Sequence, residues 1–384
     1  MNAIKYIVYL TILHISIVGK AQVAVHNYGN LQLHNKGLLG FHTDFVNDSG
    51  FDKNLGLIGF YQQEGNLSIS GAFSPSFYDF EVAVESDLYL DVSINIDNSL
   101  SFIYGNVKSP RNNKNIYTKL AEKAIYHGAM NFSKVDGHVA VEGQKKFSFP
   151  VGYDDIIRPL QIEFADDIFY AKCEYFHENP DYPESSAISF DTKSRDPSLG
   201  GIYMEEFWNL ITSGRVQITL NWNSGSNLQS SVGDIKYITV VGWSKINEQW
   251  DNLGNTLYEG NIDSGWVTSN VFNANDYEIF TLGFLFDLNA NEPGNYPLTP
   301  NGDGVNDFFS LKILEQSSDN ILKIFDRAGL LVFEKSNYRD EFSGIANKNI
   351  ARKYQQLPEG VYFYLLELKD LNLKYQGYIY LVAK

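Results

Sequence analysis

The sequence predicts an all-β protein of several domains, and three observations lead to this prediction. Aromatic residues, which favour strands, make up 15% of the 384 residues, with 25 Tyr and 26 Phe against 3 Met. Apolar residues make up 44% and charged residues 20%, which is typical of globular domains and not of disordered chains. Short apolar runs alternate with Gly, Asn and Asp turn signals, and only residues 118–126 have a helical pattern.

Residues 1–21 have the pattern of a secretory signal peptide. Lys5 precedes a mostly apolar stretch, residues 6–18, and small residues then occupy the −3 and −1 positions of a cleavage site, Gly19 and Ala21. As a helix this stretch would rise about 20 Å, less than the roughly 30 Å of a bilayer core, which favours a signal peptide over a retained anchor. No other stretch approaches the length of a membrane-spanning helix, so we expect export and no membrane span after signal removal.

Residues 22–157 follow as short strands, and a repeat within them raises the question of a β-solenoid. The sequence GLLGF at residues 37–41 recurs as GLIGF at residues 56–60, nineteen residues later. That spacing is about one coil of a β-solenoid, in which each coil pairs with the next. Two hairpins of an ordinary sheet would give the same pair by chance, so a short solenoid and an ordinary sheet are both open at this point.

Residues 158–288 contain longer strand patterns, which predict a second β-domain, a β-sandwich. In one of these strands Cys173 shares its face with Ala171 and Tyr175, because side chains of a strand alternate between two faces. We therefore expect a buried, unreactive thiol, and a single cysteine excludes an internal disulfide. The expected strands are residues 160–164, 168–176, 216–222, 235–243 and 277–286.

All five tryptophans lie in this second domain, and two interpretations compete for them. Indole faces exposed on a sheet would form a platform for sugar rings. Trp222, however, shares its face with the apolar Ile218 and Leu220, which predicts a core residue. Trp250 and Trp266 lie in polar, turn-rich segments and are the candidates for exposure, whereas core positions are expected for most of the set. The tryptophans are Trp208, Trp222, Trp243, Trp250 and Trp266.

No motif in the chain points to a catalytic residue, a metal site or a cofactor. The sequence has no Gly-x-Ser-x-Gly elbow, His-Glu-x-x-His pattern, phosphate loop or dinucleotide fingerprint. His26, His34 and His42 recur every eight residues, but no Cys or acid completes a convincing ligand set near them. We therefore expect a protein that is not an enzyme and that holds no cofactor or metal.

Three pairs of adjacent acids are the remaining candidates for acid–base chemistry. Neighbours in a strand point to opposite faces, so each pair is better explained by a solvated turn than by a shared site. Two carboxylates facing each other across a cleft, about 5–10 Å apart, would instead favour a hydrolase. The pairs are Asp154 and Asp155, Asp166 and Asp167, and Glu205 and Glu206.

The charge of the chain is divided unevenly between its parts. The whole chain has a net charge of −16 and a pI of about 4.8. Residues 293–384 carry 11 basic and 11 acidic residues, whereas residues 22–292 carry 17 basic and 35 acidic residues, a net charge of −18. Nucleic-acid binding requires a surplus of Lys and Arg, so nucleic acid is excluded as a partner. A polar stretch with Pro and Gly, residues 289–296, is the expected linker.

Residues 297–384 form the last predicted domain, a β-sandwich of immunoglobulin-like size. Short strand runs are separated by turn signals, and Gly329 supplies the positive φ of a tight hairpin loop. The last run is expected to pair with the one before it through a turn at residues 369–372. The runs are residues 308–315, 321–326, 330–334, 361–368 and 374–383.

Four sequence blocks of this last domain resemble a known family. They are, in order, LTPNGDGVNDFF at residues 298–309, LKIFDRAG at 322–329, LPEGVYFY at 357–364 and GYIYL at 377–381. Together they are similar to the gliding-motility-associated C-terminal domain, the type B sorting domain of the type IX secretion system. Ala328 stands where that family commonly has Trp, and EFSG at residues 341–344 stands where Trp-Asp-Gly is usual. The motif residues are Thr299, Pro300, Asn301, Gly302, Asp303, Gly304, Asn306, Asp307, Phe325, Arg327, Gly329, Pro358, Gly360, Tyr362, Gly377 and Tyr380.

The resemblance implies a route and a location for the whole chain. A sorting domain of this type directs what precedes it across the outer membrane to the cell surface, with the type IX secretion machinery as partner. We therefore expect an extracellular or cell-surface protein whose passenger, residues 22–288, is structural or adhesive and takes a surface glycan or protein as ligand. The alternative is a carbohydrate-binding protein that uses exposed tryptophans of residues 208–266.

The loop at residues 301–307 has two interpretations. Alternating Asn, Asp and Gly residues also build calcium loops, but Thr299 replaces the first acidic ligand and no bidentate Glu follows. An Asx/Gly turn would instead place Gly302 and Gly304 in left-handed conformations and use the carboxylates to cap backbone N–H groups. The turn is the favoured interpretation, and no metal ligand is assigned.

Overall fold

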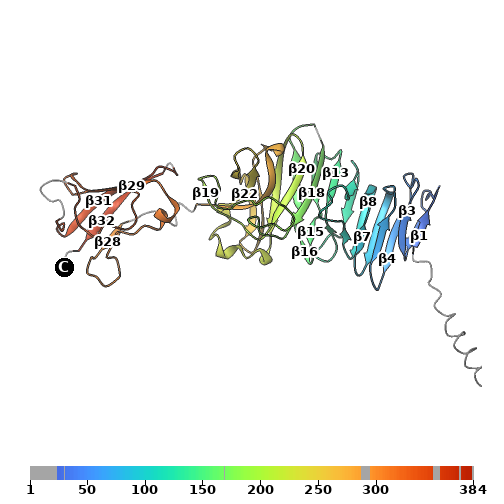
Figure 1. The fold of residues 1–384 in the computed structure, drawn as a ribbon, viewed down its shortest axis with the longest axis horizontal. Coiled ribbons are helices and arrows are strands. Elements are labelled where there is room, and N and C mark those ends of the chain that lie inside the picture. The colour runs from blue at the N-terminus through green and yellow to red at the C-terminus, as the bar shows by residue number, and fades with distance from the viewer. Residues whose placement is uncertain are drawn as a thin grey trace, which may run out of the picture. The chain divides into compact units, whose positions relative to one another are not determined.

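The computed structural model shows an all-β protein, which confirms the predicted fold class (Figure 1). Its regular elements are strands and short 3₁₀ helices, and no helix of the described residues is long and apolar enough to cross a membrane. The structure describes residues 24–29, 31–167, 169–286, 295–348, 355–371 and 373–382.

The chain divides into two compact units. The predicted signal peptide, residues 1–21, lies outside the described residues, as does most of the expected linker, residues 289–296. The boundary expected between residues 157 and 158 falls inside the first unit. The units are Met1–Ser194 with Tyr203–Leu282, and Arg195–Ile202 with Gly283–Lys384.

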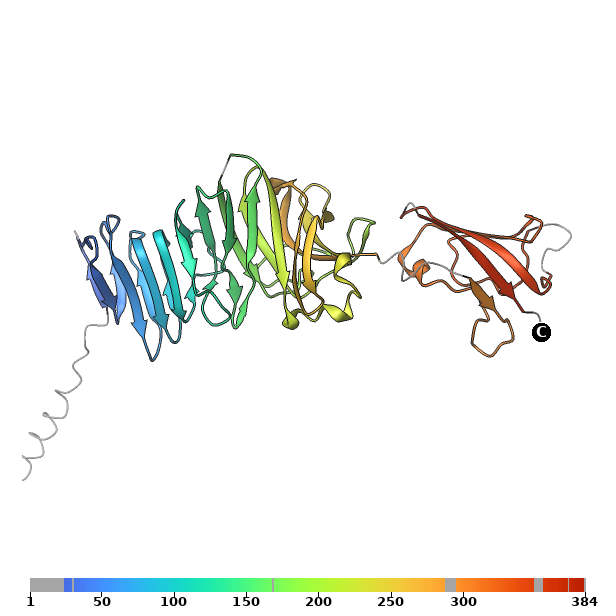
Figure 2. The same cartoon turned by 180° about the vertical axis from the view of Figure 1, so that it is seen from behind.

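A β-solenoid of about six coils begins the described chain, which decides between the two interpretations of the repeat. Each coil gives one strand to a six-stranded parallel sheet and one to a longer second sheet, so that strands of successive coils stack side by side (Figures 1 and 2). The first sheet contains β1 (Ala24–Asn27), β3 (Asp44–Asn47), β5 (Leu67–Ser70), β7 (Leu88–Leu90), β9 (Val107–Lys108) and β12 (Val135–Asp136). The second begins with β2 (Leu38–Phe41), β4 (Leu57–Gln62), β6 (Ser76–Val84), β8 (Ile94–Tyr104), β10 (Thr118–Leu120) and β13 (Val139–Glu142), with β11 (Ile125–His127) on β8.

Two glycines of the repeat, Gly40 and Gly59, make room for a tyrosine that packs across two coils. Gly40 of β2 pairs with Gly59 of β4 in parallel register. A Cβ on Gly59 would lie 2.1 Å from the hydroxyl oxygen of Tyr61, so the Tyr61 ring occupies the space that a side chain would take. The Tyr61 hydroxyl donates to the Glu81 carboxylate of the next coil at 2.8 Å. Desolvation and this hydrogen bond raise the pKa of Tyr61 to about 12.

A β-sandwich continues directly from the solenoid. The longer sheet of the solenoid extends past β13 through antiparallel strands and forms one sheet of the sandwich. The indole N–H of Trp208 in this extension donates to the carbonyl of Arg158, which adjoins the other sandwich sheet, at 2.9 Å. The extension contains β18 (Tyr170–Phe176), β20 (Phe207–Thr212), β27 (Tyr277–Leu285), β22 (Ile238–Ser244) and β23 (Gln249–Gly254), with β19 (Leu199–Ile202) on β27. The other sheet of the sandwich, here called the second sandwich sheet, contains β14 (Lys146–Phe149), β17 (Leu160–Phe164), β21 (Arg215–Trp222), β25 (Ser264–Thr268) and β24 (Leu257–Asn261), with β26 (Phe272–Asn273) on β21. Smaller elements are β15 (Gly152–Tyr153), β16 (Ile156–Ile157), η1 (Ser224–Ser226), η2 (Leu228–Ser230), η3 (Ile235–Tyr237) and η4 (Ala274–Asp276).

Two local expectations for this unit have different outcomes. Cys173 is fully buried in β18, as its alternation pattern predicted. The helical pattern at residues 118–126 is misleading, because these residues form β10, a turn and β11. Residues 118–120 pair with β8 on one side and with β13 on the other, and this pairing outweighs a local helical preference.

The second unit contains a five-stranded sheet with the two hairpins that the sequence predicted. One hairpin turns at Gly329, whose φ is 79°, and the other joins Leu368 to Leu373. The strand order is β28-β32-β31-β29-β30, and one face of the sheet is buried in an apolar core. The elements are β28 (Tyr296–Leu298), η5 (Lys312–Gln316), β29 (Asn320–Phe325), β30 (Leu331–Ser336), β31 (Gly360–Leu368) and β32 (Leu373–Leu381).

The expected strand at residues 308–315 is wrong, since this segment contains the 3₁₀ helix η5. Ile313 and Leu314 are neighbours and both are buried, which the alternating faces of a strand do not allow. The described strands of residues 295–382 all lie in one sheet. Side chains of the connecting segments, including Phe309 and Phe342, complete the core over its buried face.

Candidate functional site

The loop after β28 is closed by hydrogen bonds to one carboxylate. Asp307 accepts from the backbone N–H of Gly302 at 2.6 Å and of Gly304 at 2.8 Å. Both glycines have positive φ, 78° and 85°, where a residue without Cβ is favoured. The side-chain oxygen of Asn301 accepts from the N–H of Asp303 at 3.0 Å. This is the predicted Asx/Gly turn, and calcium binding by the loop stays a prediction that a melting-temperature titration with Ca²⁺ would test.

The second and third sequence blocks meet beside the β29–β30 hairpin. The Asp326 carboxylate accepts from two N–H groups of the hairpin loop, at 2.9 and 3.0 Å, and Gly329 completes the turn with its positive φ. A Cβ on Gly360, at the start of β31, would lie 3.2 Å from a guanidinium nitrogen of Arg327. The glycine therefore leaves room for the arginine side chain.

Two further motif residues, Tyr362 and Gly377, have contacts at or next to the β31–β32 pair. The Tyr362 hydroxyl donates to the carbonyl of Pro358 at 2.8 Å. Gly377 pairs with Tyr364 across the two strands, and a Cβ on Gly377 would lie 2.7 Å from the Tyr364 ring. A glycine opposite an aromatic residue lets the ring lie over the strand, so this block has a packing role.

Strand register gathers most of the motif at one end of the sheet. Leu298 of β28, Leu381 of β32 and Gly360 of β31 are aligned, and Phe325 at the end of β29 pairs with Phe363. Gly377 lies further along β32, opposite Tyr364. The motif residues that form or adjoin this end are Thr299, Pro300, Asn301, Gly302, Asp303, Gly304, Asn306, Asp307, Phe325, Arg327, Gly329, Pro358, Gly360, Tyr362 and Tyr380.

In the first unit, four of the five tryptophans are buried, as expected for most of them. The predicted exposure of Trp250 is wrong: its indole is fully buried against Trp243, with ring centroids 5.7 Å apart, and donates to the Phe190 carbonyl at 3.1 Å. The sequence around Trp250 is turn-rich, but its hydrogen-bond partner lies 60 residues earlier, beyond any local pattern. Trp266 is the half-buried tryptophan that reaches the surface.

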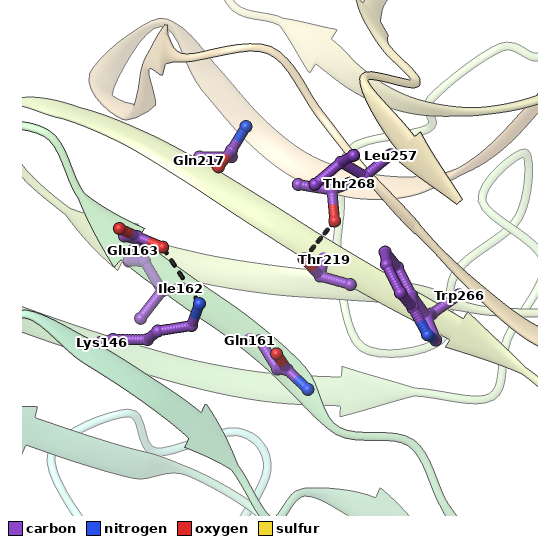
Figure 3. Close-up of a pocket in the computed structure, with 9 residues that line it drawn as sticks. All are labelled: Lys146, Gln161, Ile162, Glu163, Gln217, Thr219, Leu257, Trp266 and Thr268. Carbon is purple, nitrogen blue, oxygen red and sulfur yellow. Dashed lines mark hydrogen bonds and ion pairs between the residues drawn. The ribbon is translucent and has the colours of Figure 1, made fainter. Parts of the chain in front are cut away.

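Trp266 borders a surface hollow of about 410 Å³ on the outward face of the second sandwich sheet (Figure 3). The Lys146–Glu163 ion pair, 3.1 Å long, lies at one end of the hollow, and Trp266 lies at the other. Between them Thr219 and Thr268 share a hydrogen bond of 2.7 Å. The lining residues are Lys146, Gln161, Ile162, Glu163, Gln217, Thr219, Leu257, Trp266 and Thr268.

Two side chains of this hollow have polar groups available to a ligand. The buried Trp208 and Trp222 each donate their indole N–H to a backbone carbonyl at 2.9 Å. The indole N–H of Trp266, in contrast, has no hydrogen-bond acceptor within the described part of the chain, and the exposed side-chain amide of Gln161 has no partner there either. An apolar ring beside free amide and indole donors is an arrangement that binds hydroxylated rings, because the ring face stacks while the donors fix orientation.

Sequence reasoning found only part of this hollow. Alternation in β21 predicted that Gln217 and Thr219 face away from Trp222. It gave no indication that Gln161 of β17 and Thr268 of β25 lie beside Thr219, because that depends on the order of strands in the sheet.

The acid pair at residues 205–206 is not a solvated turn, which corrects that expectation. Glu206 is 1% exposed and accepts from the Arg158 Nε at 2.9 Å and from the Tyr175 hydroxyl at 2.5 Å. Burial raises the pKa of Glu206, and the Arg158 charge opposes that rise. Asp154 and Asp155 are exposed in a turn, as expected. The Arg158–Glu206 pair is enclosed in the sandwich core, and we assign it a structural role.

Among the described residues, no group of three or more His, Cys, Asp or Glu side chains is placed to hold a metal ion. The histidines that recur every eight residues do not converge. His26 contacts the Asp48 carboxylate at 2.6 Å and stacks on Tyr28, whereas His34 and His42 are exposed.

Comparison with known proteins identifies the C-terminal part of the chain. Residues 293–381 match the CHU_C type IX secretion signal domain, and the match spans all four sequence blocks. The resemblance inferred from those blocks is therefore confirmed. No curated protein and no solved structure matches the chain.

Proposed function

We propose, from the type IX secretion signal domain at residues 293–381, that this protein is exported to the cell surface and that its solenoid–sandwich passenger is an adhesive, non-catalytic module. Among adhesive ligands, the geometry favours a carbohydrate over a protein. The observation that carries this choice is that the half-buried Trp266 indole and the free amide of Gln161 line the same hollow on an outward sheet face.

The other lining residues of the hollow favour an uncharged glycan as the ligand. Lys146 and Glu163 neutralise each other, so the lining residues carry no net charge. Thr219 and Thr268 add hydroxyl groups in the middle of the hollow. Stacking on one indole typically contributes about 0.5–1.5 kcal/mol beyond the area buried, which predicts weak binding that a surface array of many copies would strengthen.

Glycan-array binding of the purified protein tests this proposal. Trp266→Ala should lower binding to neutral glycans at least about fivefold, as expected for the loss of roughly 1 kcal/mol of stacking. Tyr182→Ala is the matched control, because Tyr182 is an aromatic residue that is 82% exposed elsewhere on the passenger. Equal binding by Trp266→Ala and wild type would contradict the assignment of this hollow, and release of reducing ends from a bound glycan would contradict a non-catalytic passenger.

Deletion of residues 373–384 tests the export step. The deletion removes β32, the strand between β28 and β31, and exposes the edge of β31. The truncated protein should stay in the periplasm with its passenger folded, whereas the full chain reaches the surface. Protease accessibility on intact cells, followed by fractionation, measures this difference. Normal surface exposure of the truncated chain would contradict the role given to this domain.

A further inference from the structure

The C-terminal sheet buries one face and leaves the other uncovered within the described residues. Along β31, Tyr362 and Tyr364 point into the core and are at most 5% exposed. Phe363 lies between them, points outward and is 49% exposed. Covering large exposed aromatic side chains with a partner is favourable, because it removes apolar surface from water.

The outward aromatic residues are gathered at one end of the sheet. Strand pairing aligns one row of residues across β30, β29, β31 and β32, namely Leu331, Phe325, Phe363 and Tyr378. A second row crosses β31, β32 and β28, namely Val361, Tyr380 and Pro297. Tyr378 and Tyr380 are 39% and 43% exposed. We call these seven side chains the aromatic face: Leu331, Phe325, Phe363, Tyr378, Val361, Tyr380 and Pro297.

The other half of the same outward surface has a different character. Glu367 and Lys374, which pair across β31 and β32, form an ion pair of 2.8 Å. Lys323 and Glu334 form another across β29 and β30, at 3.6 Å. These charges satisfy one another, so this half presents no group that requires a partner.

We propose that a protein component of the type IX secretion machinery binds the C-terminal domain through the aromatic face. This inference rests on the proposed export function and names the surface that the machinery contacts. The opposite face of the sheet is occupied by the domain's own core. The domain carries equal numbers of acidic and basic residues, so an apolar contact explains its recognition better than charge attraction does.

The composition of the aromatic face matches the centre of a protein interface. Tyr, Phe and Arg are enriched among the residues that dominate binding energy, and polar residues surround them. Arg327 lies over Gly360 at the edge of the face, and the Tyr380 hydroxyl donates to Glu359 at 3.3 Å. Phe325, Arg327 and Tyr380 also belong to the sequence blocks that identify the domain, and their exposed atoms are not explained by the core alone.

The test uses the full chain, expressed in a strain with an intact type IX system. Phe363→Thr combined with Tyr378→Thr removes two central anchors and keeps strand-favouring residues. The fraction of the protein exposed at the surface should fall at least about tenfold, which corresponds to roughly 1.4 kcal/mol of lost affinity, and intact protein should accumulate in the periplasm. Glu367→Thr combined with Lys374→Thr is the matched control on the same two strands, and its export should equal wild type.

Three outcomes would overturn this inference. The first is wild-type export of the Phe363/Tyr378 variant. If deletion of residues 373–384 nevertheless blocks export, the proposed export function stands and only the role of the aromatic face is refuted. The second is equal loss of export in the Glu367/Lys374 control. The third is a photo-crosslinker at position 363 that captures only a second copy of this chain. If the double variant loses its melting transition, Tyr380→Thr alone replaces it with the same expected direction.

Discussion

Lys134 connects the end of the solenoid to the segment that follows it through hydrogen bonds. Its side chain is fully buried, and its ammonium group donates to the Asn106 side-chain oxygen at 3.0 Å, to the Asn131 carbonyl at 2.8 Å and to the Asp154 carbonyl. Asp154 lies in the turn of the small β15–β16 hairpin. A single buried lysine therefore donates to three oxygens from three segments, which an apolar residue of the same size does not do.

Lys134→Met should lower the free energy of unfolding by about 1–3 kcal/mol, because the buried side-chain oxygen of Asn106 and two partly buried carbonyls lose their donor. Lys119→Met is the control: Lys119 is also a lysine of the solenoid, but its ion pair with Glu142 is largely exposed, so its loss should cost less than about 1 kcal/mol. Denaturant unfolding of the three proteins at neutral pH measures the difference. Equal stability of Lys134→Met and wild type would refute the role given to this lysine.

The pH dependence of the same variants separates charge from packing. Burial lowers the pKa of Lys134 from 10.5 to about 8. Between these values the unfolded chain binds a proton that the folded chain releases, so the contribution of Lys134 to stability rises with pH, by at most about 1.4 kcal/mol per pH unit. The stability difference between wild type and Lys134→Met should therefore grow from about pH 8 to about pH 10.

At the scale of elements, the solenoid was detectable from one pair of coils only. Leu38 pairs with Leu57, an offset of 19 residues, whereas Phe45 pairs with Ile69, an offset of 24. Loops of unequal length remove a fixed period from the sequence, so the pattern survives only where Tyr61 requires glycine in two successive coils. The strands β17 and β21 were predictable because their burial alternates, but the order of strands was not, and the hollow beside Trp266 depends on that order.

Gly59→Ala tests how the coils are joined. The new methyl group would lie 2.1 Å from the Tyr61 hydroxyl oxygen, so the ring must move and the hydrogen bond to Glu81 must break. We expect a loss of about 1–3 kcal/mol in the free energy of unfolding. Gly233→Ala is the matched control, since nothing lies within 4 Å of the added Cβ. A thermal or denaturant midpoint for Gly59→Ala equal to that of the control would refute this account of the repeat.

At the scale of the whole molecule, acidity is confined to one part of the chain. Residues 22–292 carry a net charge of −18, and residues 293–384 are neutral. An acidic passenger repels other polyanions over roughly the Debye length, about 8 Å at physiological salt. The same repulsion opposes the close approach of two passengers, whereas the neutral C-terminal part carries no net charge that would repel a partner.

The purified protein should therefore pass through heparin and DNA columns at about 0.15 M salt and be retained by an anion exchanger. The expectation follows from net charge, because retention on a polyanion requires a cluster of Lys and Arg that displaces counterions. Residues 22–292 have 17 basic residues against 35 acidic ones, and several of the basic side chains are already paired, including Arg158 with Glu206 and Arg215 with Asp166. Salt elution from both columns measures the outcome. Retention on heparin at this salt would show a basic surface patch. It would favour an acidic glycan as the ligand over the neutral glycan that we propose for the Trp266 hollow.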